Sequence, residues 1–155
     1  MNNVEAVITH AEGYCTNHGA RLTAKRKQVL AALLSSKKAL SAYDLVDFFK
    51  EEYREDIAPM SIYRILDFLE EQHLVHKLKL ANKYVACEHI HCDHTHGVSQ
   101  FLFCESCSKV KEINISQSMI QSMKISAQEA GFKLTRPQLE LSCICENCDT
   151  KNNQY

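Results

Sequence analysis

The chain has 155 residues, of which 45% are hydrophobic and 24% charged, with only four glycines and two prolines. This composition is typical of a globular protein and excludes a disordered, collagen-like or low-complexity chain. The net charge of −1 argues against a protein that coats nucleic acid through bulk positive charge. The length fits one compact domain or two small ones.

The sequence indicates a reduced cytoplasmic protein. No apolar run reaches the 18 residues that a membrane-spanning helix needs, so we expect no membrane partner. The start MNNVEAVITH lacks the basic residues and apolar core of a secretory signal. Because cytoplasmic thiols stay reduced, the eight cysteines are expected to be metal ligands or redox groups rather than disulfides.

Three helical patterns occupy the first half of the chain. Thr23 is a candidate N-cap for the first, and Ser41 with Asp44 forms a capping-box pattern for the second. Pro59 marks the start of the third. The apolar stripe of this third helix consists of Ile62, Ile65, Leu66 and Leu69, and its outward side of Ser61, Tyr63, Arg64 and Asp67.

A hairpin pattern follows the third helix. In LVHKLKLANKYVAC, two strand-like runs flank the turn signal Ala81-Asn82-Lys83. Three helices followed by a hairpin are typical of a winged helix-turn-helix domain. A local excess of basic residues within residues 1–40 fits either a phosphate-binding face or a solvated surface, and charge alone leaves both open.

The second half is predicted to be a small α+β unit. FLFC and VKEINI are strand-like, and FKLTRPQLELSC is a further strand with Pro137 interrupting it or at its edge. Ser116 or Ser118 opens a helix between them that Gly131 closes. Only the tail KNNQY is expected to be disordered. The fold class is therefore α+β.

Two C-x-x-C motifs carry the strongest chemical signal. Cys104-x-x-Cys107 and Cys145-x-x-Cys148 are separated by 37 residues. Each motif places two thiolates on one tight turn, and two such turns form the tetrahedral sulfur cage that suits zinc. A redox disulfide would need one motif near a βαβ pattern, which is missing. With four sulfur ligands no water position is left, so this zinc is expected to be structural.

A second set of metal-ligand residues lies around an abrupt change in composition. Between Cys87 and Cys107, eight of twenty-one residues are Cys or His, which marks a hinge or boundary. Mixed nitrogen, sulfur and oxygen ligands suit a second zinc, although a histidine-dense stretch is also compatible with adventitious metal binding. The candidates are His76, Cys87, His89, His91, Cys92, His94, His96 and Glu112.

Several segments together resemble one family. They are Arg21-Leu22-Thr23 with Arg26, the segment SAYDLVDFF, the segment PMSIYRILDFLEEQHLVHK and the paired C-x-x-C motifs. This combination, over roughly residues 5–148, resembles the ferric uptake regulator (Fur) superfamily. SAYDL, YRILDFLEEQ, the VHK strand and the YVAC hinge are most similar to its zinc uptake regulator branch.

The resemblance implies a domain organisation with four parts. A winged-helix DNA-binding domain with a hairpin wing would cover residues 1–86, and a His/Cys-rich hinge region residues 87–97. A dimerisation domain with the structural zinc would cover residues 98–149, followed by a tail at 150–155.

The resemblance also implies two zinc ions per chain. Cys104, Cys107, Cys145 and Cys148 match the structural site. The regulatory site is matched by His76, Cys87, His96 and Glu112. His94 is the alternative to His96, because the spacing between Cys87 and Cys104 is slightly expanded. His89, His91, Cys92 and Cys143 have no clear family counterpart.

The implied function is that of a zinc-responsive transcriptional repressor and not an enzyme. Loaded with zinc, a homodimer would bind double-stranded operator DNA and repress zinc-uptake genes. Whether two dimers share one operator stays open. The expected base-reading residues are Arg64 and Tyr63 with Ser61, and the expected backbone contacts are Tyr43, Lys25, Arg26 and Lys77.

Two alternatives remain at this stage. An iron or peroxide sensor of the same superfamily would need a site rich in oxygen and nitrogen, whereas the Cys87 thiolate favours zinc. A zinc-dependent hydrolase is less favoured, because the chain contains neither H-E-x-x-H nor H-x-E paired with P-C-x-x-C.

Overall fold

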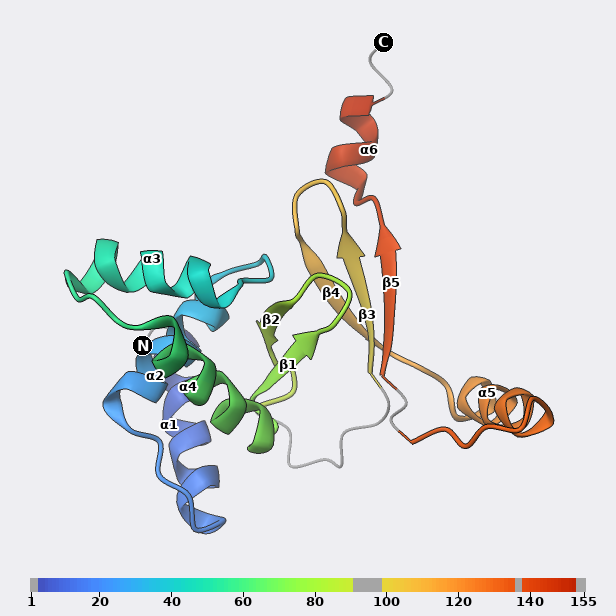
Figure 1. Ribbon diagram of the computed structural model, residues 1–155, viewed down its shortest axis with the longest axis horizontal. Coiled ribbons are helices and arrows are strands. Elements are labelled where there is room, and N and C mark those ends of the chain that lie inside the picture. The colour runs from blue at the N-terminus through green and yellow to red at the C-terminus, as the bar shows by residue number, and fades with distance from the viewer. Residues whose placement is uncertain (1–2, 91–98, 136–137, 153–155) are drawn as a thin grey trace. The chain divides into compact units, whose positions relative to one another are not determined.

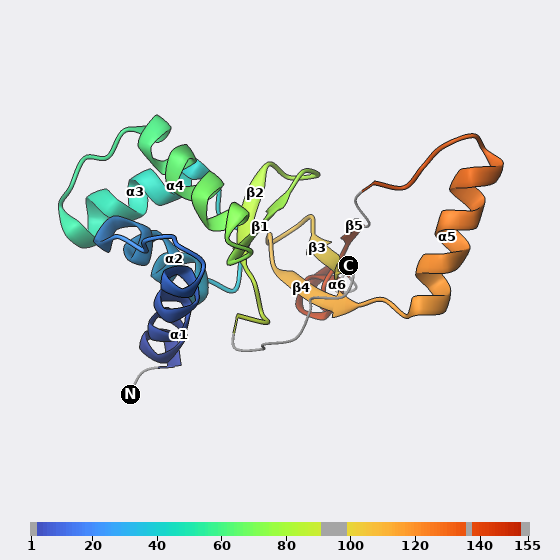
Figure 2. The same cartoon turned by 90° about the horizontal axis from the view of Figure 1, so that it is seen from below.

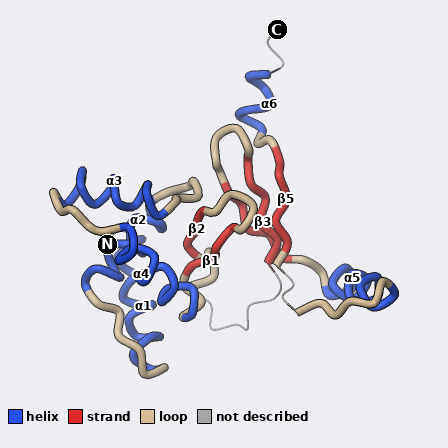
Figure 3. The backbone as a smooth tube through the Cα atoms, in the orientation of Figure 1, coloured by secondary structure: helices blue, strands red, loops and turns tan. Residues whose placement is uncertain are grey.

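The computed structural model describes residues 3–90, 99–135 and 138–152. The chain divides into two compact units, Met1–Asp93 (unit 1) and His94–Tyr155 (unit 2). The division falls inside the segment 87–97 that we expect to be a hinge. Helices make up most of unit 1 and a three-stranded sheet forms the centre of unit 2 (Figures 1 and 3).

Unit 1 is built from four helices and a hairpin. The helices are α1 (Asn3–Asn17), α2 (Ala24–Ser35), α3 (Ala42–Tyr53) and α4 (Pro59–Glu71). The sequence patterns account for the last three, and α1 is an additional helix that buries Val7, Ala11 and Cys15. The four helices surround one apolar core (Figure 2), whose fully buried side chains include Leu30, Leu45, Phe49, Ile62, Leu66 and Leu69.

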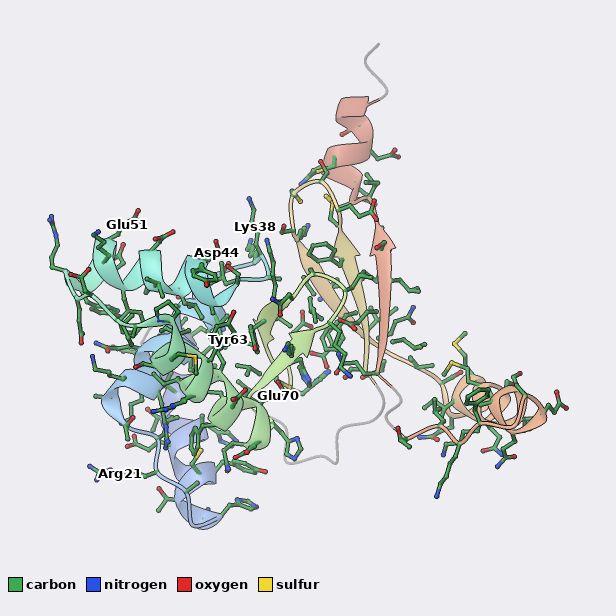
Figure 4. The ribbon with its side chains drawn as sticks, in the orientation of Figure 1. Arg21, Lys38, Asp44, Glu51, Tyr63 and Glu70 are labelled. Carbon is green, nitrogen blue, oxygen red and sulfur yellow. The ribbon has the colours of Figure 1, made fainter. Side chains whose placement is uncertain are left out.

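The three helix starts expected from the sequence are present. Thr23 occupies the N-cap position of α2, but its side chain accepts no cap hydrogen bond. Ser41 and Asp44 form a complete capping box: the Asp44 N–H donates to Ser41 Oγ (3.0 Å), and the Ser41 N–H donates to Asp44 Oδ2 (2.8 Å). Figure 4 shows Asp44 at the start of α3. Pro59 is the first residue of α4.

The hairpin consists of β1 (Val75–Leu78) and β2 (Lys83–Ala86), which pair antiparallel. The turn occupies residues 79–82, one or two residues earlier than the sequence signal, because Lys83 already pairs with Leu78. Tyr84 is buried, and burial together with the α4 carboxylates Asp67 and Glu70 raises its pKa to about 12. The hydroxyl therefore stays protonated where the hairpin faces α4.

Helix α4 passes into β1 through a short hydrogen-bonded junction. The Leu74 N–H donates to the carbonyl of Leu69 (2.9 Å), and the His73 N–H donates to that of Glu70 (2.9 Å). His73 adopts a left-handed conformation (φ 58°), which turns the chain out of the helix. Only residues 72–74 separate the two elements, so β1 is held in a defined position relative to α4.

Unit 2 contains β3 (Ser99–Cys104), β4 (Val110–Asn114), α5 (Gln117–Glu129), β5 (Leu139–Cys143) and α6 (Glu146–Asn152). The strand order is β4-β3-β5, with β3 antiparallel to β4 and parallel to β5. Helix α5 provides the crossover that a parallel pair requires. The expected α+β class is confirmed.

Local signals in unit 2 agree with the structure except in the last predicted strand and at the C-terminal end. The strand expected over FKLTRPQLELSC begins only at Leu139, and residues 132–135 are not part of it. Ser116 caps α5, since its Oγ accepts the Met119 N–H (3.3 Å), and Gly131 follows the helix with φ 84°. Pro137 lies outside the described residues. Helix α6 is not indicated by the sequence patterns, and it extends into the expected tail, residues 150–155.

The helices of the described residues include none that is long and apolar enough to cross a membrane.

Replacing Ser41 with Ala should lower the stability of unit 1. The change removes the acceptor for the Asp44 N–H and breaks the reciprocal capping box, which typically costs about 1 kcal/mol in free energy of unfolding. Thr23→Ala is the matched control, because the Thr23 side chain makes no cap bond. Urea unfolding monitored by circular dichroism should show a clear loss for Ser41→Ala only, and equal losses would contradict the assignment.

Candidate metal centres and helix α4

The parallel pairing of β3 with β5 brings the two C-x-x-C motifs together. Cys104 is the last residue of β3, and its register partner is Cys143, the last residue of β5. The chain beyond each strand then turns at the same edge of the sheet. The sulfur atoms of the two motifs lie within 4.8 Å of one another. Figure 4 shows sulfur atoms gathered where the β3–β4 turn meets the start of α6.

The geometry of this cluster fits a tetrahedral metal ion. The Cys107 and Cys145 sulfurs are 3.7 Å apart. A zinc ion with bonds of about 2.3 Å to four sulfurs requires sulfur–sulfur distances of about 3.8 Å. The seven cysteines in the described part of the chain are free thiols, so disulfide bonds do not hold the motifs together. Four sulfurs complete the coordination and suit a structural zinc.

The backbone around the cluster favours a thiolate at Cys104. Backbone N–H groups of Cys145 (3.3 Å from the sulfur) and Cys107 lower the pKa of Cys104 to about 6. The Ser106 side chain acts to lower the pKa of Cys148, but the neighbouring Cys145 thiol and burial outweigh it and raise that pKa to about 11. A bound metal cation would stabilise the thiolate form of the sulfurs that hold it.

His76 and Cys87 lie on one face of the hairpin in unit 1. His76 is opposite Val85 in the register, and the Cys87 N–H continues the ladder by donating to the Leu74 carbonyl (2.9 Å). Since side chains alternate along a strand, His76 and Cys87 become diagonal neighbours on the same face. A ring nitrogen of His76 and the Cys87 sulfur lie within 4.8 Å of each other. Cys87 is buried, and His76 is partly buried.

Glu112 belongs to β4 of unit 2, where it is a buried carboxylate in a strand whose other residues are more exposed. The Ser99 hydroxyl donates to Glu112 Oε1 (2.5 Å) across the β3–β4 pair. This hydrogen bond holds one carboxylate oxygen in place. The expected ligands His94 and His96 lie outside the described residues, as do His91 and Cys92.

Helix α4 presents a polar face to solvent. Ser61 and Arg64 are exposed, as expected from the helical pattern. Tyr63 differs from the expectation, because it is half-buried and packs against the core. Tyr43 at the start of α3 is 63% exposed.

The basic candidates for backbone contact have partners within unit 1. Lys25 forms an exposed ion pair with Glu55. Arg26 lies over the Phe68 ring (3.5 Å to its centroid) and donates to the Arg21 carbonyl (2.7 Å), so it joins α2 to α4. Lys77 lies 5.8 Å from the centroid of the Tyr84 ring. These contacts orient the side chains on the surface around α4.

Three residues at the metal centres or on α4 were not identified from the sequence patterns. Ser99 holds Glu112 only because of the strand register, for which the sequence carries no local signal. Ser106 acts on Cys148 across the cluster. Met60 on α4 is 64% exposed, and the helical pattern that placed Arg64 outward could also have identified it.

Comparisons with known proteins agree with these features. The model of the ferric uptake regulator family matches residues 17–142. The zinc uptake regulation protein of Escherichia coli (strain K12) is 35% identical over 144 residues, which cover 93% of this chain and 82% of the relative. A solved zinc uptake regulator complexed with zinc and DNA has a TM-score of 0.86 and 31% identity, with 99% of both chains covered. The holo form of XcZur has a TM-score of 0.76 and 30% identity, with 94% of this chain and 98% of that chain covered.

Replacing Cys104 with Ser should remove one zinc ion per chain and unfold or loosen unit 2. A structural zinc in small domains contributes about 10–16 kcal/mol of apparent binding free energy, which couples directly to folding. Cys143→Ser is the matched control, because Cys143 lies beside the cluster but outside the group of four. Zinc content by mass spectrometry, together with circular dichroism, should separate the two variants. A folded Cys104→Ser protein with unchanged zinc content would exclude the structural assignment.

Proposed function

Because the chain belongs to the ferric uptake regulator family, we propose that it is a zinc-responsive transcriptional repressor. Members of this family are transcription regulators and not enzymes. In the proposal, a zinc-loaded homodimer in the cytoplasm binds double-stranded operator DNA and represses zinc-uptake genes. The observation that carries the proposal is the proximity of His76, on the strand that directly follows α4, to Cys87 at the end of the hairpin, whose nitrogen and sulfur atoms lie within 4.8 Å.

We assign two zinc ions to each chain. The four cysteines of unit 2 bind the structural ion. His76 and Cys87 of unit 1 and Glu112 of unit 2 bind the regulatory ion together with His96, or with His94 in its place. The chemistry of these donors supports zinc, since thiolate sulfur, imidazole nitrogen and carboxylate oxygen are all ligands that zinc binds in tetrahedral sites. The same thiolate argues against the iron or peroxide sensor, whose site would be rich in oxygen and nitrogen.

The regulatory zinc would act by joining the two units. Its proposed ligands come from both sides of the hinge, so an unliganded hinge leaves the angle between the units unconstrained. Coordination would restrict that angle and bring the two recognition helices of a dimer to a fixed separation. Converting a 1:99 population into 99:1 requires about 5.5 kcal/mol of preference for one state. A four-ligand zinc site can supply that amount.

The rigid connection between β1 and α4 supports this mechanism. The N–H groups of Leu74 and His73 donate to carbonyls near the end of α4. A displacement of His76 on metal binding would therefore move the helix with the strand. Tyr84 of the partner strand β2 is buried in the core of unit 1, which fixes the hairpin to the helices. Binding at the hairpin would therefore orient α4 as a unit.

Helix α4 is the proposed recognition helix in the major groove. Arg64 is exposed and has the geometry to bind guanine O6 and N7, with Ser61 beside it. Tyr63 is half-buried, so only its outer edge would reach a base. Tyr43, Lys25, Arg26 and Lys77 surround this helix as proposed phosphate contacts. A symmetric dimer would bind a pseudo-palindrome with half-sites about one helical turn apart.

Unit 2 has the apolar surface that a dimer interface needs. Large hydrophobic side chains are exposed on β4, β5 and α5 and in the segments that follow α5 and β5: Ile113, Met119, Ile125, Phe132, Leu141 and Ile144. Phe132 is the extreme case, with 74% of its surface exposed. Burying these side chains against a second copy would stabilise a homodimer.

Replacing Cys87 with Ser should abolish the response to zinc without unfolding the protein. The variant keeps the four cysteines of unit 2, so we expect a folded dimer with one zinc per chain. Operator affinity should no longer rise when zinc is added, because the thiolate ligand is missing. His76→Ala should behave in the same way.

The measurement uses a duplex selected by the wild-type protein from a randomised library with saturating zinc. Zinc content, oligomeric state and duplex affinity are determined on one preparation of each variant. His89→Ala serves as the matched control, since His89 lies in the same stretch but outside the proposed ligand set. A Cys87→Ser protein that still gains duplex affinity with zinc would refute the regulatory site, and a wild-type protein that selects no duplex would refute the repressor function.

A further inference from the structure

Met60 is an apolar side chain in an exposed position on α4. It lies in the first turn of the helix, directly after Pro59, and 64% of its surface is exposed. No other large hydrophobic side chain in the described part of unit 1 is more exposed, although Tyr43 comes close at 63%. Apolar residues of the same helix at Ile62, Leu66 and Leu69 are fully buried. Core packing therefore does not explain the methionine.

The position of Met60 relative to Arg64 is defined by the helix. Residues four apart lie on the same face, so Met60 and Arg64 point toward one side, with Ser61 next to them. Their separation along the axis is about 6 Å, which corresponds to between one and two base-pair steps of about 3.4 Å. In a helix that lies along the major groove with Arg64 on a base edge, Met60 would be within reach of a neighbouring base pair.

The chemistry of methionine restricts what it can contact there. Its side chain has no hydrogen-bond donor and only a weak acceptor, so it has little affinity for phosphate oxygens or polar base edges. In the major groove the apolar group of a base pair is the C5 methyl of thymine. Methionine is also unbranched and flexible, which allows it to follow that methyl closely.

We propose that Met60 is a specificity-determining residue that packs against the C5 methyl of a thymine close to the base bound by Arg64. The inference rests on the proposed function and extends it by adding an apolar contact to the polar contacts of α4. The contact favours thymine over cytosine and over uracil, since both lack the methyl. Burial of one methyl group changes the affinity for the duplex by about fourfold. Burial of one methyl in each of two symmetric half-sites changes it by about 16-fold.

The test is a methyl-deletion scan of the selected duplex. Each thymine of both half-sites is replaced in turn by deoxyuridine, which removes only the methyl, and the affinity of the zinc-loaded protein is measured by fluorescence anisotropy. Wild-type protein should lose about 16-fold at one symmetric thymine pair. In Met60→Ala that loss should disappear, while the loss at other thymines stays. Met60→Leu should retain the effect, and Met60→Gln, of similar length but polar, should not.

Tyr63→Ala is the comparison variant on the same helix. It should keep the deoxyuridine penalty at the Met60 thymine pair, since a different side chain makes that contact. Thermal unfolding of Met60→Ala should be unchanged, because the side chain is exposed. A wild-type protein that selects a duplex but shows the same deoxyuridine profile as Met60→Ala would overturn the inference and leave the repressor function intact. Failure to select any duplex would overturn both.

Discussion

The hydrogen-bonded junction between α4 and β1 fixes the position of the strand relative to the helix, and the proposed function requires this fixed position. Three residues connect the proposed recognition helix to the strand that carries His76, and Leu74 donates back to Leu69 within the helix. On the second strand of the hairpin, Tyr84 is buried in the core of unit 1. Because these hydrogen bonds connect the helix directly to the strand, a metal bound at the proposed hairpin ligands would control the proposed DNA contacts without changing the fold of unit 1.

The two candidate metal sites have different physical roles. In unit 2 the four cysteines lie within one compact unit, and their motifs meet because β3 and β5 run parallel and end at the same edge. That arrangement closes the coordination shell and suits stability. The proposed regulatory site instead draws its ligands from both units, and only such a site can couple metal occupancy to the angle between them. In the proposal, one zinc therefore stabilises the fold and the other regulates it.

Residue patterns predicted much of this architecture where the signal is local. The capping box at Ser41 and the period of α4 are short-range features, and the two C-x-x-C motifs carry their own spacing. Helix α6 has only seven residues and little apolar character, so no periodicity marks it. The hydrogen bond between Ser99 and Glu112 depends on strand register, which no local pattern encodes. The partial burial of Tyr63 depends on tertiary packing against the core. The regulatory ligands were predicted only through the family resemblance, because isolated histidines and a strand glutamate are common without metal.

A regulatory zinc that orients α4 requires zinc binding and duplex binding to be coupled in both directions. Zinc affinity is measured by competition with a chromophoric chelator, with and without saturating selected duplex, and duplex affinity is measured with and without saturating zinc. If zinc controls α4 through the hairpin, the duplex should tighten the binding of the two regulatory zinc ions of a dimer. The product of these two factors should equal the factor by which zinc tightens duplex binding. The structural zinc should stay bound throughout. Zinc affinity that is the same with and without the duplex would contradict the account.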